Sequence, residues 1–300
     1  KTTTLNGIIR ILESKGEKVG LATPTGRAAK RITELTGREA KTIHRMREYT
    51  QTGTERCFQR NHGNPVEYDA VIIDECSMVD LWLFDHLLDA LPLSSRLILV
   101  GDVNQLPPVG PGSVLKDILF SGCVPAVELT EIFRQARESL IITNAHAVLH
   151  GEMPILNETK KDFFFLKAAH PQAAVNLAVE LAAQRLPAAY DFSPATDIQI
   201  LSPTRRGTAG TSNLNRELRE KINPASYQKK EMTFRDIVFR EGDKVMQIRN
   251  NYDLITERDD GTLDAGVYNG DLGIIEAVIP AQESLIVRFD DRRVTYTNET

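Results

Sequence analysis

The chain has 300 residues, enough for two domains, or three if one is small. Its net charge of −5 argues against a histone-like nucleic-acid binder, and its 41% hydrophobic and 26% charged residues are ordinary for a soluble globular protein. No apolar run is long enough to cross a bilayer, so we expect no membrane partner. The three separated cysteines form neither a disulfide framework nor a zinc pattern, which favours the cytoplasm.

The chain opens with "KTTT", followed by an amphipathic helical pattern. In a P-loop, a lysine and a threonine or serine follow a glycine-rich turn and begin a helix, where they hold phosphates and Mg²⁺. Lys1 and Thr2 fit the end of such a loop, although no glycines precede them in this sequence. An ordinary helix start is the alternative.

Short apolar runs alternate with helical patterns up to about residue 130. The spacing predicts strands over 18–23, 69–74 and 96–102, and helices over 26–35 and 78–91. Strands this apolar have both faces covered. The fold class that follows is α/β, with a parallel sheet flanked by helices.

A basic strip lies between Arg27 and Arg47, with seven basic residues against two acidic ones. An acidic protein can hold a phosphate backbone along one such strip. A solvated helix face is the alternative interpretation.

The stretch "AVIIDECSMVD" ends an apolar strand in Asp74 and Glu75. Ligands bind at the carboxyl edge of parallel strands, where an aspartate can hold Mg²⁺ during phosphoryl transfer. The adjacent glutamate can accept a proton from an attacking water. Alternatively the pair caps the following helix, as Ser77 could also do.

The stretch "LILVGDVNQLPPVGPG" is a second buried strand that ends in Gly101 and Asp102. Gln105 follows on a loop stiffened by prolines. A glutamine delivered to the same sheet edge as Asp74 suits a sensor of the γ-phosphate. A proline-rich connector is the alternative, but it does not require this order of residues.

Beyond residue 130 the pattern changes. We predict helices over 139–151, 172–186 and 213–223, and strands over 162–166 and 197–203.

From about residue 235 the pattern becomes β. It predicts strands over 243–250, 271–279, 284–290 and 293–298, arranged as a small antiparallel barrel or meander.

Six ordered motifs resemble the RecD/TraA branch of superfamily-one DNA helicases, which includes the exodeoxyribonuclease V α subunit. They are "VIIDECSMVD", "GDVNQLPPVGPG", "LTEIFRQA", "LSPTRRG", "GDKVMQIRNNYD" and "VYNGDLG". The resemblance runs from residue 1 to about residue 298. It implies two RecA-like P-loop NTPase domains with ATP between them, single-stranded DNA across the top, and a small SH3-like β-barrel insertion. The activity it implies is ATP-driven 5′→3′ movement and strand separation in recombination or repair.

The resemblance also assigns roles to matching positions around the nucleotide. Lys1 and Thr2 match the end of motif I, for phosphate and Mg²⁺. Asp74 matches the Mg²⁺ ligand of motif II.

Three further positions are implied to act in catalysis. Glu75 matches the catalytic base, and Gln105 matches the glutamine that senses the γ-phosphate. Arg134 matches an arginine whose guanidinium stabilises charge on the transferring phosphate. From the residues alone, a salt bridge from Arg134 to Glu131 or Glu138 is the alternative.

The resemblance implies DNA contacts in three stretches, "ATPTGRAAKRI", "TIHRM" and "SPTRRG". The contacting residues expected there are Thr23, Thr25, Gly26, Arg27, His44, Arg45, Thr204, Arg205 and Arg206. A helix start with threonines can bind a phosphate, which agrees with the first stretch. His44 is alternatively structural. Two interpretations stay open for Asn250, Asn251 and Tyr252, DNA contacts or turn residues, and the turn is favoured.

We expect a first RecA-like domain over 1–130, part of a second over 131–235, and the barrel over 236–300. The glycine-rich half of motif I and motifs V and VI are not in the sequence. We therefore expect a central helicase segment, with Lys1 as the P-loop lysine, that by itself hydrolyses ATP weakly or not at all.

Three alternatives stay open at this point. They are the helicase part of a conjugative relaxase, a P-loop ATPase acting on another substrate, and a DNA-binding module with an inactive nucleotide site. The resemblance also allows other subunits of a nuclease–helicase complex as partners.

Overall fold

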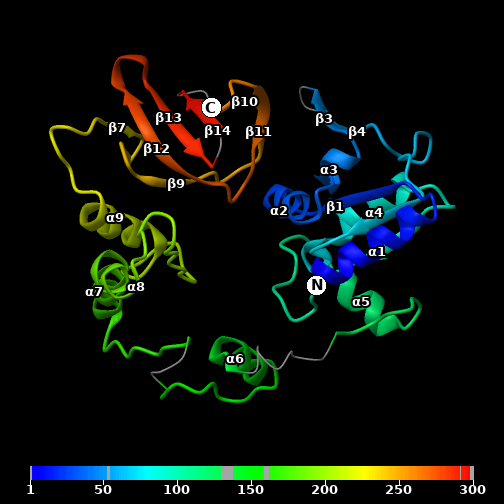
Figure 1. Cartoon of the computed structure of the whole chain (residues 1–300), viewed down its shortest axis with the longest axis horizontal. Coiled ribbons are helices and arrows are strands. Elements are labelled where there is room, and N and C mark those ends of the chain that lie inside the picture. The colour runs from blue at the N-terminus through cyan, green and yellow to red at the C-terminus, as the bar shows by residue number, and fades with distance from the viewer. Residues whose placement is uncertain (1, 53–54, 130–137, 159–161, 291, 298–300) are drawn as a thin grey trace. The chain divides into compact units, whose positions relative to one another are not determined.

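A computed structural model of the chain describes residues 2–52, 55–129, 138–158, 162–290 and 292–297 (Figure 1). The chain divides into two units, residues 1–131 and 132–300. Each unit is described by itself. The finer division expected from the sequence, into three parts, stays a prediction.

The first unit is built on a parallel sheet with the strand order β2-β1-β5-β6. Its strands are β1 (Val19–Thr23), β2 (Ala40–Thr42), β5 (Ala70–Ile73) and β6 (Arg96–Leu99). The three predicted strands are confirmed, although the last ends at Leu99 rather than at residue 102. β2 was not predicted, because "AKT" is too short and too polar to form an apolar run.

One face of this sheet is covered by α1 (Thr2–Ser14) and α2 (Gly26–Thr36). Their apolar residues share one cluster with the strands, made of Leu5, Ile9, Leu12, Leu21, Ile32, Ala70 and Ile72. Successive side chains of a strand point to opposite faces, so the neighbouring strand residues face the other way.

The other face is covered by α3 (Ile43–Met46), α4 (Leu81–Ala90) and α5 (Val114–Ser121). The shared cluster includes Ala22, Ile43, Met46, Val71, Ile73, Leu83, Leu87 and Leu115. The sheet is therefore buried between helices on both sides, as the apolar strands predicted. A hairpin of β3 (Tyr49–Thr52) and β4 (Glu55–Phe58) follows α3.

Helix α4 begins later than predicted, at Leu81 instead of residue 78. The reason is its cap: Asp80 Oδ1 accepts a hydrogen bond of 2.8 Å from the Leu83 N–H, and residues Cys76–Met78 form a separate 3₁₀ turn. The helix ends at Ala90, because Leu91 takes an extended conformation before Pro92.

The second unit contains helices α6 (Leu140–Leu149), α7 (Pro171–Glu180), α8 (Leu186–Tyr190) and α9 (Thr211–Ile222). The helix predicted over 172–186 is present and longer. A π-helical turn, Leu181–Arg185, joins α7 to α8. Pro187 lacks an N–H group and so cannot continue a regular α-helical ladder, which accounts for a bulge at this place.

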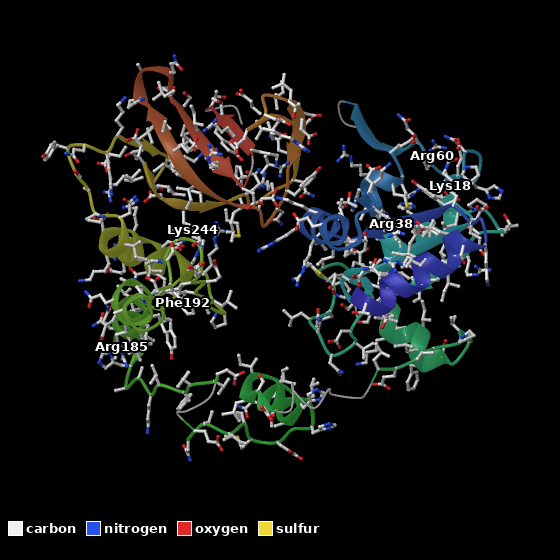
Figure 2. The ribbon with its side chains drawn as sticks, viewed as in Figure 1. Lys18, Arg38, Arg60, Arg185, Phe192 and Lys244 are labelled. Carbon is white, nitrogen blue, oxygen red and sulfur yellow. The ribbon has the colours of Figure 1, made fainter. Side chains whose placement is uncertain are left out.

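The strands predicted over 162–166 and 197–203 are wrong, since neither segment pairs with a strand among the residues that the structure describes. An apolar run forms a strand only when a neighbour completes its hydrogen bonds. Here Phe165 is 55% exposed and Leu201 is 88% exposed. Lys244 Nζ donates a hydrogen bond of 3.0 Å to the Ile198 carbonyl and anchors the second segment (Figure 2).

The second unit ends in an antiparallel sheet with the order β11-β10-β14-β13-β12-β9. The strands are β9 (Lys244–Met246), β10 (Asn251–Arg258), β11 (Leu263–Val267), β12 (Leu272–Ile279), β13 (Ser284–Phe289) and β14 (Arg292–Tyr296). A hairpin of β7 (Glu231–Phe234) and β8 (Ile237–Arg240) precedes it. The apolar core gathers Leu254, Val267, Ile275, Val278, Val287, Phe289 and Val294.

Strands β12, β13 and β14 confirm three of the four predicted β segments. Of the fourth, 243–250, only Lys244–Met246 is a strand. β10 was not predicted, because its buried face includes Thr256. This residue is fully buried but polar, so it does not contribute to an apolar pattern in the sequence.

Within the part of the chain that the structure describes, no helix is long and apolar enough to span a bilayer. The same residues contain no group of three or more His, Cys, Asp or Glu side chains placed to hold a metal ion.

Candidate nucleotide and DNA site

Asp74 lies where three strands of the first unit end. Its N–H donates to the Ala22 carbonyl of β1 at 2.9 Å, and the Cys76 N–H donates to the Val100 carbonyl after β6 at 3.0 Å. The residue therefore sits between the ends of β1 and β6, and it is 8% exposed. This is the carboxyl edge of the sheet that the sequence predicted.

Glu75 turns the chain sharply after the strand. It adopts a left-handed conformation, with φ 54°, which is uncommon for a residue with a side chain. Asp74 Oδ1 accepts the Glu75 N–H at 2.8 Å and holds this turn. Such backbone conformations gather at functional sites, because the surroundings must impose them.

The alternative that the acidic pair caps the next helix does not hold. α4 is capped by Asp80, and Glu75 makes no side-chain capping bond to the 3₁₀ turn that follows it. The carboxylates of Asp74 and Glu75 are not used as helix caps.

Cys76 follows directly and is fully buried. Burial raises the pKa of its thiol to about 12, and the nearby Asp74 carboxylate adds to the rise. The thiol therefore stays neutral and unreactive near neutral pH.

The loop that carries Gln105 begins against the same turn. A Cβ at Gly101 would lie 2.5 Å from Leu115 Cδ2 and 3.1 Å from the Ser77 backbone nitrogen. Only glycine fits so close an approach. Gln105 itself is exposed, and its Nε2 lies 3.5 Å from Asp102 Oδ2.

Three predicted nucleotide residues have no described side chain. Lys1 and Arg134 lie outside the described residues, and Thr2 begins α1 without a described side chain. Their roles stay predictions.

The first predicted DNA stretch forms the start of α2. Thr25 caps this helix, since its Oγ1 accepts the Ala28 N–H at 3.3 Å, and Gly26 is buried. Arg27 is exposed beside them. Thr23 is the last residue of β1 and is fully buried, and its hydroxyl donates to the Thr25 carbonyl at 2.7 Å, which stabilises the turn into α2. Its contact with DNA stays a prediction.

The second stretch forms α3, capped by Thr42, whose Oγ1 accepts the Arg45 N–H at 3.1 Å. Arg45 is exposed and His44 is half-buried. Burial and the charge of Arg47 lower the pKa of His44, while Asp80 opposes them. The imidazole is therefore neutral at neutral pH and can reach a phosphate only by a hydrogen bond.

The basic strip contributes less positive charge to the surface than its sequence indicates. Arg47 is 2% exposed and donates to the Arg60 carbonyl at 3.1 Å. Arg38 pairs with Glu13, with 2.6 Å between Nε and Oε1 (Figure 2).

The third stretch lies before α9 and exposes Thr204, Arg205 and Arg206. Its carbonyls receive the first helical N–H groups: Thr211 donates to Thr204 at 3.0 Å, and Ser212 donates to Arg205 at 3.3 Å. The loop is thus fixed by its backbone while its two arginine side chains remain at the surface.

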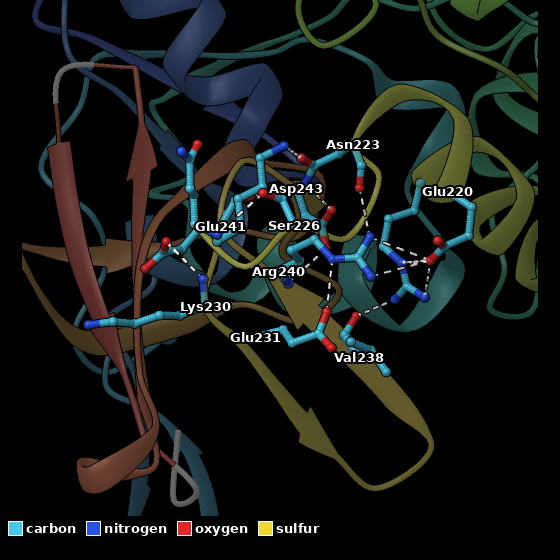
Figure 3. Close-up of polar contacts among 12 residues, drawn as sticks. Glu220, Asn223, Ser226, Lys230, Glu231, Val238, Arg240, Glu241 and Asp243 are labelled. Atoms are coloured by element: carbon cyan, nitrogen blue, oxygen red, sulfur yellow. Dashed lines mark hydrogen bonds and ion pairs between the residues drawn. The ribbon is translucent and has the colours of Figure 1, made fainter.

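Sequence reasoning missed a polar network that joins α9 to the sheet of the second unit (Figure 3). Arg240 is 4% exposed; its Nη1 donates to the Asn223 carbonyl at 2.7 Å, and its Nε to Glu231 Oε2 at 2.9 Å. Asn223 Nδ2 donates to Asp243 Oδ1 at 2.7 Å. The "GD" of "GDKVMQIRNNYD" therefore has a structural role at Asp243.

The loops of the two β motifs contact each other. Asn250 Oδ1 accepts the Asn269 N–H at 2.9 Å, and Gln247 receives the Gly270 N–H at 2.8 Å on its carbonyl. This is the turn role that the sequence favoured for Asn250. The same interpretation is wrong for Asn251 and Tyr252, which begin β10.

Two family models match the chain. The model described as "AAA domain" matches residues 1–111, and the model described as "ATP-dependent RecD-like DNA helicase SH3 domain" matches residues 214–289. The first range covers the parallel sheet with Asp74, Glu75 and Gln105. The second runs from within α9 to the end of β13.

Two named proteins are similar to this chain along most of its length. An ATP-dependent RecD2 DNA helicase of Deinococcus radiodurans is 35% identical over 99% of this chain and 37% of its own length. A RecBCD enzyme subunit RecD of Mycobacterium tuberculosis is 26% identical over 92% of this chain and 51% of its own length. The chain therefore spans about a third to a half of these relatives.

Among solved structures, a Pif1 helicase from Bacteroides in complex with ADP-AlF3 and single-stranded DNA is 20% identical. The likeness covers 99% of this chain and 68% of that chain, with a TM-score of 0.45.

The parallel sheet and its strand-end acids lie in the range that matches the AAA domain model. Strands β9 to β13 lie in the range that matches the RecD-like DNA helicase SH3 domain model. Over almost its whole length the chain is similar to RecD2 and RecD proteins.

Proposed function

We propose that this chain is the motor segment of an ATP-dependent DNA helicase of the RecD type, which moves 5′→3′ on single-stranded DNA in recombination or repair. One observation carries the proposal. The turn of Asp74 and Glu75 lies at the carboxyl edge of the parallel sheet, and the Gln105 loop begins against that turn.

The residues at this edge fit a nucleotide with Mg²⁺. Asp74 is a buried carboxylate, which is the kind of oxygen ligand that Mg²⁺ prefers, with the Thr2 hydroxyl as the second protein ligand. Lys1 would hold the phosphates. The metal neutralises charge on the phosphates when it is bound.

The chemistry that this chain adds is acid–base and electrostatic. Glu75 accepts the proton of the attacking water, and Gln105 orients toward the γ-phosphate from its exposed loop. Arg134 stabilises the charge that develops on the transferring group. ATP binding and hydrolysis would drive the conformational cycle that steps the motor.

Single-stranded DNA is proposed to lie along surface cations and helix starts. Thr25, Arg27 and Arg45 offer them in the first unit, and Arg205 and Arg206 in the second. Phosphate contacts of this type give affinity without sequence preference. The protein would act in the cytoplasm, alone or with other subunits of a nuclease–helicase complex.

The test is ATP hydrolysis by this chain extended at both ends to the length of its relatives, with and without a single-stranded oligonucleotide. We expect strong stimulation by DNA, and we expect a Glu75→Gln variant to lose about 10²-fold or more of the rate while still binding nucleotide. Hydrolysis that ignores DNA would reject the helicase and favour an ATPase with another substrate. Full activity of Glu75→Gln would reject the assigned base.

A further inference from the structure

The Gln105 loop is held at both of its ends. Its first end is Gly101, pressed against the turn after Glu75, as described above. Its second end lies against the start of α4, where the Leu81 N–H donates to the Pro111 carbonyl at 2.9 Å. Between these points the loop is mostly exposed.

Asp80 makes the second attachment close. A Cβ placed on Gly110 would lie 2.0 Å from Asp80 Oδ2 and 2.7 Å from Asp80 Cγ. The carboxylate cannot turn away freely, because its Oδ1 accepts the Leu83 N–H at 2.8 Å as the cap of α4. The backbone of Gly110 is therefore packed directly on a fixed side chain.

Among the residues that the structure describes, the hydrogen bonds near Gln105 between the two attachments are local. The Gln105 N–H reaches the Asp102 carbonyl at 3.2 Å, and the Asn104 N–H reaches Asp102 Oδ1 at 3.0 Å. A few hydrogen bonds within an exposed segment do not order that segment by themselves. Its conformation depends on the distance between the two attachments.

We propose that Asp80 and Gly110 form a clamp that positions Gln105, so that Asp80 is a positioning residue for the nucleotide site. The inference rests on the proposed function for the role of Gln105 as γ-phosphate sensor. Asp80 begins the helix that follows Asp74 and Glu75, and it also holds the loop that carries Gln105. Asp80 thereby links the two motifs through direct contacts.

The contact can be tested by adding a side chain at Gly110 and removing the one at Asp80. Gly110→Ala places a methyl group against the Asp80 carboxylate, at a backbone position where alanine itself is not strained. Asp80→Gly removes the obstructing atoms and keeps a residue that is tolerated as a helix cap. Gly7→Ala is the control, because a Cβ at Gly7 would meet nothing within 4 Å.

Amide hydrogen exchange of the 300-residue chain, measured without nucleotide, tests the contact between Asp80 and Gly110. We expect Gly110→Ala to speed exchange at Asn104 and Gln105 by about fivefold or more, and the double variant with Asp80→Gly to restore much of the protection. Gly7→Ala should leave it unchanged. Unchanged exchange in Gly110→Ala would overturn the clamp.

Nucleotide binding in the presence of Mg²⁺ tests whether the clamp positions Gln105. The protein used is the extended one of the ATP hydrolysis test. We expect Gly110→Ala to lose about fivefold or more of the preference for ATP over ADP, with the double variant recovering it. A preference present in the parent and unaltered in Gly110→Ala overturns the positioning role, even if exchange changes. If the parent shows no such preference, the sensor role in the proposed function fails, while exchange still decides the clamp.

Discussion

Asn223 and Asp243 share a buried hydrogen bond of 2.7 Å between Nδ2 and Oδ1, which ties the end of α9 to the start of β9. Both side chains are less than a tenth exposed, at 7% and 8%. Asp243 Oδ2 also accepts the Arg240 N–H at 2.9 Å, so one carboxylate serves both partners (Figure 3). Buried polar groups of this kind are costly to leave unpaired.

Asn223→Ala should therefore destabilise the second unit by about 1–3 kcal/mol, because it leaves part of the Asp243 carboxylate buried without a donor. Urea unfolding followed by circular dichroism measures the change. Asn176→Ala, at an exposed position on α7 whose side chain accepts a hydrogen bond from Gln172 on the same helix, should change stability by less than about 0.5 kcal/mol. Equal effects of the two variants would show that the buried bond contributes nothing particular.

Gly101→Ala should destabilise the first unit by about 1–3 kcal/mol, since its methyl group would overlap Leu115 and press on the Cys76–Ser77 backbone. Urea unfolding followed by circular dichroism measures the change. The same experiment on Gly7→Ala should show a small gain of about 0.5–1 kcal/mol, because alanine is favoured over glycine inside a helix. A Gly101→Ala protein as stable as the parent would mean that α5 and the turn after Glu75 move apart easily.

Arg205→Ala and Arg206→Ala should each weaken binding of a single-stranded oligonucleotide and reduce the salt dependence of log K by about 0.7, the value for one phosphate contact. Fluorescence anisotropy over a salt series measures both quantities. Arg185→Ala removes an exposed arginine from the same unit and should leave the slope unaltered (Figure 2). If all three variants lower the slope equally, binding follows total charge and not the loop before α9.

Glu276 should make the second unit sensitive to acid. The hydrogen bond from Arg288 and then that from Arg293 hold the pKa of this carboxyl below its ordinary value. A lowered folded pKa adds stability that is present above the unfolded pKa and is lost as pH falls through the folded value. The melting temperature should therefore fall from about pH 5 to about pH 3 less steeply in Glu276→Gln than in the parent.

Glu257→Gln is the control for that experiment, because it removes an exposed carboxylate from β10 in the same sheet. A parent and a Glu276→Gln variant with parallel pH profiles would show that the ion pairs with Arg288 and Arg293 are fully screened by solvent.

The sequence by itself determined the parallel sheet and the place of Asp74. Apolar runs such as the one before Asp74 are long enough to identify as buried strands, and parallel strands deliver their ends to one edge. Apolar spacing was also enough to identify α2 and α4, because it acts within a few residues along one helix. The start of α4 was missed, since the sequence offered several possible cap residues and the structure uses Asp80.

Other features were decided by the tertiary structure alone, because they depend on contacts between residues far apart in the sequence. The apolar runs at 162–166 and 197–203 are not strands, because a strand exists only with a hydrogen-bonding neighbour. Thr23 is buried at the end of β1 and Asn223 is the partner of Asp243, since burial depends on segments far along the chain. The contact of Asp80 with Gly110 has the same origin: it joins residues that only the packing of the Gln105 loop on α4 brings together.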